Sequence, residues 1–248
     1  LVLSTYANGG FDESIWDCGG TWMDSSLAMA AHRGLCYDEY EPFVSDGTEA
    51  TIVSEEKKGV CEYQLNYAST ITGGRNAIKN KIKELGGVMV SYYADDLYMT
   101  FDNKSYYDPE TTKYSGINHA VSVVGWDDNY SYTNFEYTPR SFDGEKYTYE
   151  NGAWIVRNSW GERWGNDGYE YISYMDPTIG FNVTGYKFDN SVNDNVYTYS
   201  PLGVGGSSGI TNVMGYMYMV NRYDVREKGA EEILTSIGLY VLDTADTY

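Results

Sequence analysis

Hydrophobic residues recur at helical spacing in two segments of the chain. The first segment covers residues 21–31, stops before Gly34, and places four apolar residues on one face: Met23, Leu27, Ala30 and Ala31. The second covers residues 75–85, where Ile78, Ile82 and Leu85 share a face and Gly86 follows. Apolar residues at this spacing line one side of a helix, and glycine commonly ends one. The pattern predicts two helices, and the small residues of the first suit a central, closely packed helix.

The rest of the pattern is mostly that of β-strands. Short runs of aliphatic and aromatic residues predict strands at 62–71, 88–92, 119–125, 153–157 and 169–173. Residues 37–60 show neither helical nor strand periodicity and are interpreted as loops with short helical turns. The polar, tyrosine-rich residues 127–150 predict a long hairpin or inserted loop. A helix followed by a run of antiparallel strands favours an α+β fold.

The sequence pattern changes after about residue 185. Short strand-like runs alternate there with a Gly/Ser-rich turn at 203–209 and a charged loop at 224–232. This alternation of short strands and turns is typical of a separate β-rich module. We therefore divide the chain into residues 1–185 and a β-rich segment at 186–248.

Composition and charge exclude several classes of partner. The 248 residues carry 36 acidic and 17 basic side chains, a formal net charge of −19. This field repels nucleic acid and anionic lipid, so neither is expected as a partner. No apolar run reaches the ~18 residues of a membrane span. Both ends of the sequence resemble strands, and we expect the chain to be a piece of a longer protein whose targeting signal lies elsewhere.

The cysteines and histidines indicate no metal site and no cofactor. Three cysteines allow one disulfide with one thiol left over, and spacing leaves open a Cys18–Cys61 pair or three free thiols, Cys36 among them. The chain has two histidines, His32 and His119, and no Cys-x-x-Cys motif. A structural zinc site is not expected from this set.

One segment carries a specific chemical signal. Residues 158–169 read Asn-Ser-Trp-Gly-Glu-Arg-Trp-Gly-Asn-Asp-Gly-Tyr, after the strand-like Trp-Ile-Val of 154–156. Residues 118–121 read Asn-His-Ala-Val and lead to a second strand-like run ending at Gly125. Together these segments resemble the papain-like cysteine peptidases, whose Asn-Ser-Trp-Gly-x-x-Trp-Gly-x-x-Gly-Tyr motif is matched at every fixed position.

The resemblance runs from about residue 16 to about 175 and implies a fold and three site residues. The fold is the two-lobed papain-like one, with a helical lobe at about 1–60 and an antiparallel, barrel-like β lobe at about 61–185. His119 takes the place of the histidine that shuttles the proton, and Asn158 that of its orienting asparagine. Trp160 should cover the hydrogen bond between them and exclude water.

The nucleophile departs from the family pattern. The family reads Cys-Gly-x-Cys-Trp, with the second cysteine at the start of the central helix, whereas residues 18–22 read Cys-Gly-Gly-Thr-Trp. Thr21 therefore stands in the nucleophile position. The glutamine that helps to bind the oxyanion, six residues earlier in the family, is replaced by Ile15. An internal threonine lacks the free amine that known threonine nucleophiles use as a base, and losing one oxyanion donor costs about 3 kcal/mol.

Other interpretations of these residues are weaker. Cys18 lies three residues before the helix, out of reach of its dipole, and is not expected to act as the nucleophile. A deliberate replacement of the nucleophile would not explain Ile15. Thr21 suits an N-cap that satisfies an amide of its own helix.

These features predict a catalytically inactive peptidase homologue that binds a peptide or protein segment within a larger secreted or cell-surface bacterial protein. One alternative is a weak peptidase using Thr21, His119 and Asn158. Another is a spacer for a carbohydrate-binding module, because residues after 185 resemble, at low specificity, the lectin-like module that follows the peptidase domain in some bacterial surface peptidases.

Overall fold

The computed structural model describes residues 63–110, 116–180 and 182–190, together with residues 26–28, 30, 31, 34, 35, 37, 222, 233, 234 and 237. The chain forms two compact units, one of residues 1–65 and 189–248 and the other of residues 66–188. The predicted division at residue 185 is not tested by this partition and stays a prediction. Each unit is considered by itself.

In the first unit, the end of the first predicted helix is confirmed. Residues 26–28, 30 and 31 are helical, and the amide of Gly34 donates to the carbonyl of Ala30 at 3.0 Å. Gly34 has φ 75°, a left-handed conformation that glycine adopts without strain at the end of a helix. The side chain of Gln64 donates to the carbonyl of Ala31 at 2.8 Å. Ile15, Thr21 and the three cysteines lie outside the described residues.

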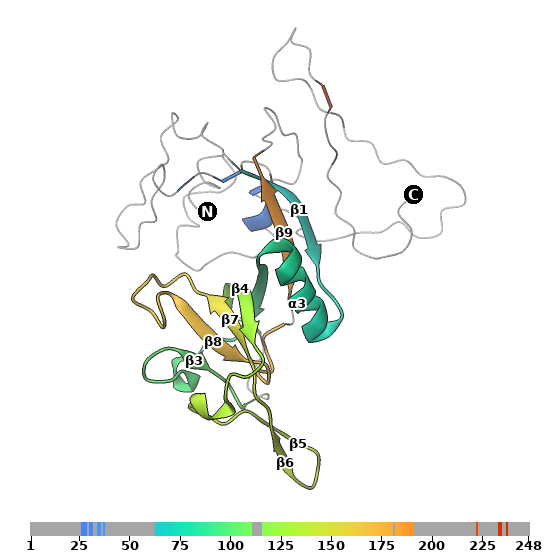
Figure 1. The fold of residues 1–248 in the computed structure, drawn as a ribbon. Coiled ribbons are helices and arrows are strands. Elements are labelled where there is room, and N and C mark those ends of the chain that lie inside the picture. The colour runs from blue at the N-terminus through green and yellow to red at the C-terminus, as the bar shows by residue number, and fades with distance from the viewer. Residues whose placement is uncertain are drawn as a thin grey trace, which may run out of the picture. The chain divides into compact units, whose positions relative to one another are not determined.

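A seven-stranded sheet forms the framework of the described chain (Figure 1). Its order is β1-β9-β2-β4-β7-β8-β3. The strands are β1 Gln64–Thr70, β2 Val88–Tyr92, β3 Ser105–Tyr106, β4 His119–Asp127, β7 Ala153–Arg157, β8 Tyr169–Ser173 and β9 Thr184–Asp189. The five strands expected from the sequence are confirmed, whereas β3, the short helix η3 (Asp96–Tyr98) and the extent of β9 were not predicted.

Helix α3 (Gly74–Leu85) confirms the second helix prediction and packs on β2 and β4. Ile78 and Ile82 are buried beneath it, and Gly86 ends it in a left-handed conformation with its amide bonded to the carbonyl of Ile82. The spacing of the apolar residues predicts that Ile78 and Ile82 are buried together, because residues four apart lie on the same face of a helix.

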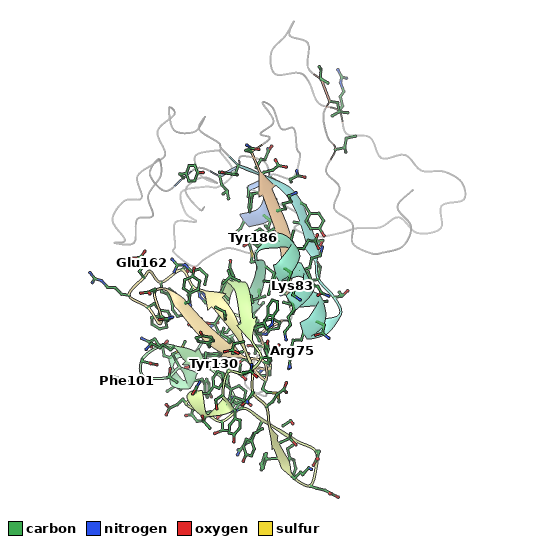
Figure 2. The ribbon with its side chains drawn as sticks, viewed as in Figure 1. Arg75, Lys83, Phe101, Tyr130, Glu162 and Tyr186 are labelled. Carbon is green, nitrogen blue, oxygen red and sulfur yellow. The ribbon has the colours of Figure 1, made fainter. Side chains whose placement is uncertain are left out.

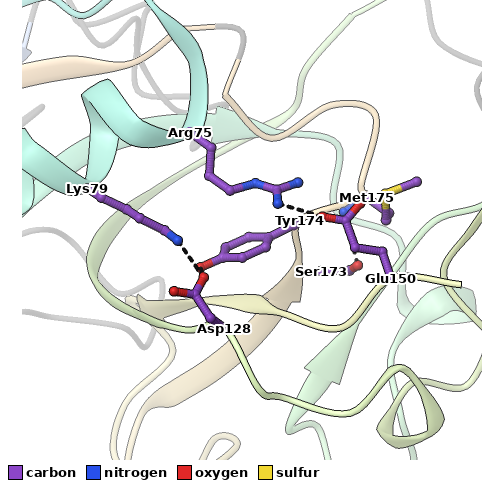
Figure 3. A network of polar contacts seen from close by, with 7 residues as sticks. All are labelled: Arg75, Lys79, Asp128, Glu150, Ser173, Tyr174 and Met175. Carbon is purple, nitrogen blue, oxygen red and sulfur yellow. Dashed lines mark hydrogen bonds and ion pairs between the residues drawn. The ribbon is translucent and has the colours of Figure 1, made fainter.

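A polar network that includes the partly buried side chains of Arg75 and Lys79 joins α3 to the sheet (Figure 3). Lys79 forms an ion pair with Asp128, which also accepts a hydrogen bond from the Tyr174 hydroxyl at 2.9 Å. Arg75 pairs with Glu150 and lies over the Tyr174 ring, 4.1 Å from its centroid. The network therefore joins the helix to the ends of β4 and β8 around one aromatic ring.

One face of the sheet carries both the core and the predicted site. Residues directly opposite each other on neighbouring strands point to the same face, and every second residue along a strand does so too. The pairing therefore places one row across four strands: Val88, Val90 and Tyr92 of β2, His119, Val121 and Val123 of β4, Trp154 and Val156 of β7, and Glu170 and Ile172 of β8. Most of these residues are buried core, and the row becomes polar at one end.

A smaller cluster covers the opposite face. Tyr107, Phe135 and Ala153 are buried there, and the rings of Tyr130 and Tyr171 stack with their centroids 4.1 Å apart. Tyr130 is visible in Figure 2, and its hydroxyl contacts that of Ser105 at 2.6 Å. The sheet is therefore packed on both faces near β7 and β8, whereas Ala120 of β4 is exposed on this face.

The insertion at 127–150 ends in the predicted hairpin. Strands β5 (Arg140–Phe142) and β6 (Tyr147–Tyr149) pair only with each other, and all six of their residues are exposed. The insertion leaves β4 at Asp127, eight residues and about 26 Å along the strand from His119. In the view of Figure 1 the hairpin extends away from the sheet. It is thus attached at the end of β4 and β7 that lies away from His119 and Asn158.

No helix in the described part of the chain is both long and apolar enough to span a bilayer.

The core residue Ile172 offers a direct test of this packing. Its side chain is 0% exposed, whereas that of Leu97, in η3, is 69% exposed. Ile172→Ala should lower the free energy of unfolding by about 2–5 kcal/mol, because it leaves a cavity in the core. Leu97→Ala should change it by no more than about 0.5 kcal/mol. Denaturant unfolding followed by tryptophan fluorescence measures both, and equal losses would contradict the assigned core.

The hairpin should be dispensable for the fold. Because Arg140 and Tyr149 face each other, an Asn-Gly turn can replace residues 140–149 and join Pro139 to Glu150. An exposed two-stranded hairpin contributes little by itself, so the free energy of unfolding should fall by less than about 1 kcal/mol. Denaturant melts of the two proteins provide the comparison, and a loss of several kcal/mol would show that the hairpin supports the sheet.

Candidate active site

The polar end of the row brings His119 and Asn158 together. His119 is the first residue of β4, and Asn158 directly follows β7, its antiparallel neighbour. The ring nitrogen Nε2 of His119 lies 3.0 Å from Oδ1 of Asn158. Asn158 is buried and His119 half-buried, so the pair lies at the margin of the core.

The loop after Asn158 is shaped by its glycines. The amide of Asn158 donates to the carbonyl of Gly168 at 3.0 Å, which closes the loop. Gly165 has φ 56°, and a Cβ atom there would lie 2.3 Å from the carbonyl oxygen of Tyr169. A side chain cannot be accommodated at that distance, and this explains why the motif requires glycine at position 165. Glu162, labelled in Figure 2, is an exposed residue of this loop.

Aromatic rings surround the imidazole of His119. The Trp160 ring stacks on it with centroids 4.8 Å apart and an angle of 16° between the planes. Trp164 meets Trp160 edge-on at 4.4 Å, and the buried Tyr92 meets His119 edge-on at 5.7 Å. Trp160 is 42% exposed, so one side of its indole covers the histidine while the rest meets solvent.

Asn118 has a structural role beside the histidine. Its side-chain oxygen accepts from the amide of Ala94 at 2.7 Å, and its side-chain nitrogen donates to the carbonyl of the same residue at 2.9 Å. Its own amide donates to the carbonyl of Tyr92 at 3.2 Å. These three bonds tie the start of β4 to the end of β2, and so they place the backbone of His119.

Glu170 is a site residue that the sequence reading missed. Its side chain is fully buried on β8, and its Oε1 accepts from Nδ2 of Asn158 at 3.0 Å and from the Tyr92 hydroxyl at 3.3 Å. Its Oε2 accepts from Nε1 of Trp164, also at 3.0 Å. A signal was present: Glu170 is two residues from Ile172 in a strand, which puts a charged residue on the inward face.

Burial is the main influence on this carboxyl. Loss of solvent raises the pKa of Glu170 above its usual value, while the hydrogen bonds from Trp164, Asn158 and Tyr92 oppose the rise. Burial likewise raises the pKa of the Tyr92 hydroxyl, and the neighbouring Glu170 adds to this shift. The interior of the site is therefore an environment that disfavours unpaired charge.

The described residues hold part of the predicted site. His119, Asn158 and Trp160 lie together, whereas Thr21 and Ile15 fall outside the described residues, and the catalytic roles assigned from the resemblance stay predictions. A histidine held in this way can accept and return a proton or bond to a ligand. Across the same described ranges, no group of three His, Cys, Asp or Glu side chains is arranged to bind a metal ion.

Comparison with known proteins identifies the family. The family described as papain family cysteine protease matches residues 7–185. Mouse testin-2 is 28% identical over 159 residues, which cover 63% of this chain and 42% of testin-2. Mouse cathepsin K is 26% identical over 159 residues, again 42% of its length. The chain thus spans less than half the length of these curated relatives.

A solved structure with a similar fold comes from a bacterium. It contains the cysteine protease and lectin-like domains of Cwp84, a surface layer associated protein of Clostridium difficile. The identity is 28% and the TM-score 0.55, over 67% of this chain and 36% of that one. With the family match over most of the chain, this likeness establishes the papain-like fold. The chain belongs to the papain family of cysteine proteases.

Proposed function

We propose that this chain is a catalytically inactive member of the papain family that binds a peptide or protein segment without cleaving it. The observation that carries the proposal is an ordered His119–Asn158–Trp160 arrangement in a chain that has Thr21 where the family has its nucleophilic cysteine. The framework for recognition is thus retained while the reacting group is replaced.

The proposed inactivity rests on the chemistry of two residues. A threonine hydroxyl is far less acidic than a thiol, so one histidine does not keep it ionised. Ile15 offers no donor to an oxyanion, which by itself lowers the rate about 10²–10³-fold. The two losses act on the same step, and together they reduce cleavage by many orders of magnitude.

The proposed binding role uses the exposed side of the same residues. Trp160 presents an indole surface beside the imidazole, which offers both apolar contact and a hydrogen-bonding nitrogen. An extended peptide is commonly held by main-chain hydrogen bonds with side-chain pockets alongside. An aromatic surface next to one polar group suits such a ligand.

The proposed setting is a secreted or cell-surface bacterial protein with several modules. The similarity to Cwp84, which is described as surface layer associated, supports this setting. In that protein a lectin-like domain accompanies the protease domain. We extend the proposal to the β-rich segment at 186–248, as a lectin-like module for carbohydrate.

Restoring the missing groups should create a peptidase. The double variant Thr21→Cys/Ile15→Gln should cleave unstructured peptides, because it supplies a thiol to His119 and a donor to the oxyanion. Thr21→Cys alone should be slower by about 10²–10³-fold. Cleavage of a fluorogenic peptide library measures both rates.

The matched control is the triple variant that also carries His119→Ala, which should be inactive. A double variant that folds but shows no cleavage dependent on His119 would contradict the assignment of this site.

Peptide binding should depend on the Trp160 surface. Peptides selected from a displayed library on the intact chain should bind Trp160→Ala at least about tenfold more weakly, because buried aromatic contacts dominate such surfaces. The control is Tyr147→Ala on the β5–β6 hairpin, an aromatic residue of similar exposure that should leave the affinity unchanged. Fluorescence anisotropy gives the affinities, and equal losses in both variants would contradict a site at His119.

A further inference from the structure

We propose that Glu170 is a positioning residue that fixes His119 from two directions. One oxygen of its carboxylate holds Asn158, which contacts the edge of the imidazole. The other oxygen holds Trp164, which packs on Trp160, the ring that covers the face of the imidazole. A single buried side chain thus supports the contacts of the histidine with Asn158 and with Trp160.

The first direction sets which end of the Asn158 amide faces His119. The oxygen and nitrogen of an amide have almost the same shape, so their neighbours decide the orientation. An ionised carboxylate only accepts hydrogen bonds, so Glu170 must face the Nδ2 amino group of Asn158. The amide of Ser159 donates to Oδ1 at 2.8 Å and favours the same orientation. Oδ1 is therefore the atom directed at the histidine.

This orientation determines the tautomer of His119. Oδ1 of Asn158 can only accept, so the Nε2 atom 3.0 Å away must carry the hydrogen. In the neutral ring the other nitrogen, Nδ1, then holds a lone pair. The histidine consequently offers an acceptor to a donor of a ligand, such as a peptide N–H. The ligand class rests on the proposed function, whereas the tautomer follows from the geometry alone.

The second direction fixes the position of the ring. Trp164 donates its single side-chain N–H, at Nε1, to Oε2 of Glu170, and this bond holds the indole against the sheet. Trp160 meets Trp164 edge-on and His119 face-on, so a displaced Trp164 would remove the support of the covering ring.

The burial of Glu170 argues against a role in packing alone. Its side chain is 0% exposed, and its three partners are neutral donors. A buried carboxylate is costly even when it is hydrogen-bonded, and an apolar side chain would fill the same strand position at lower cost. Unlike an apolar side chain, a carboxylate at this position can hold three donors in fixed places.

Nitrogen NMR of the histidine rings tests the assignment without any ligand. The chain has two histidines, so His119 is assigned by the loss of its signals in His119→Gln. At about pH 9, where an ordinary imidazole is neutral, long-range proton–nitrogen correlation spectra distinguish the Nε2–H and Nδ1–H tautomers. The intact chain should show Nε2–H at His119. An Nδ1–H ring in the intact chain would overturn the proposal, even if no variant folds.

The variant Glu170→Gln should disturb this tautomer. Trp164 can only donate, so it takes the oxygen of the new amide, whose NH₂ group then faces Nδ2 of Asn158. The clash of two donors favours a flipped Asn158 amide, whose NH₂ group then faces Nε2 of His119. The tautomer equilibrium of His119 should shift about tenfold toward Nδ1–H, which corresponds to the free energy of about one hydrogen bond. An unchanged tautomer in the folded variant would overturn the proposal.

Two further variants separate positioning from general damage. In Glu170→Gln/Trp164→Phe the new amide is free to turn its oxygen to Asn158, and the Nε2–H tautomer should return. The matched control is Asp176→Asn, because Asp176 is 5% exposed, is held by Thr178 and contacts neither Asn158 nor His119. It should lose stability but keep the tautomer. Two outcomes would assign Glu170 a merely structural role. One is a shift of the His119 tautomer in Asp176→Asn as large as that in Glu170→Gln. The other is no return of the Nε2–H tautomer in Glu170→Gln/Trp164→Phe.

Discussion

A carboxylate that is buried away from water needs hydrogen-bond donors, and this requirement organises the site on the inner strands of the sheet. Glu170 is fully buried, and it accepts hydrogen bonds from Asn158, Trp164 and Tyr92. Two of these partners hold His119, at its edge and, through Trp160, at its face. The rest of the fold positions these side chains: β2, β4 and β8 carry Tyr92, His119 and Glu170 on one face of the sheet, and Asn158 and the two tryptophans belong to the segment that joins β7 to β8.

The chain belongs to the papain family of cysteine proteases and has an ordered histidine site. From the sequence resemblance we propose that Thr21 stands in the position of the family's nucleophilic cysteine. A hydrogen-bonded and covered imidazole is also a recognition element, because it offers one directed polar atom beside an aromatic surface. This is why we propose that the site holds a ligand, with Glu170 maintaining its geometry.

Much of the fold was predictable, for physical reasons that differ between elements. Helix α3 has its apolar residues at helical spacing and glycine at its end, and β2, β4 and β7 are short apolar runs. Strand β3 has two residues and pairs with the distant β8, so no local period marks it. His119, Asn158 and Trp160 follow from sequence motifs, whereas Glu170 depends on pairing between strands. Alternation with Ile172 indicates that Glu170 points inward, but its proximity to Tyr92 and Asn158 becomes visible only once the registers of the four strands are known.

We propose that the chain binds peptides without cutting them. The most direct test incubates the intact chain at high concentration with a diverse library of unstructured peptides, next to His119→Ala, and reads the products by mass spectrometry. We expect the same background in both samples, with no cleavage that depends on His119. Cleavage by the intact chain that is lost in His119→Ala would contradict it, and would make this protein a working peptidase with an altered nucleophile.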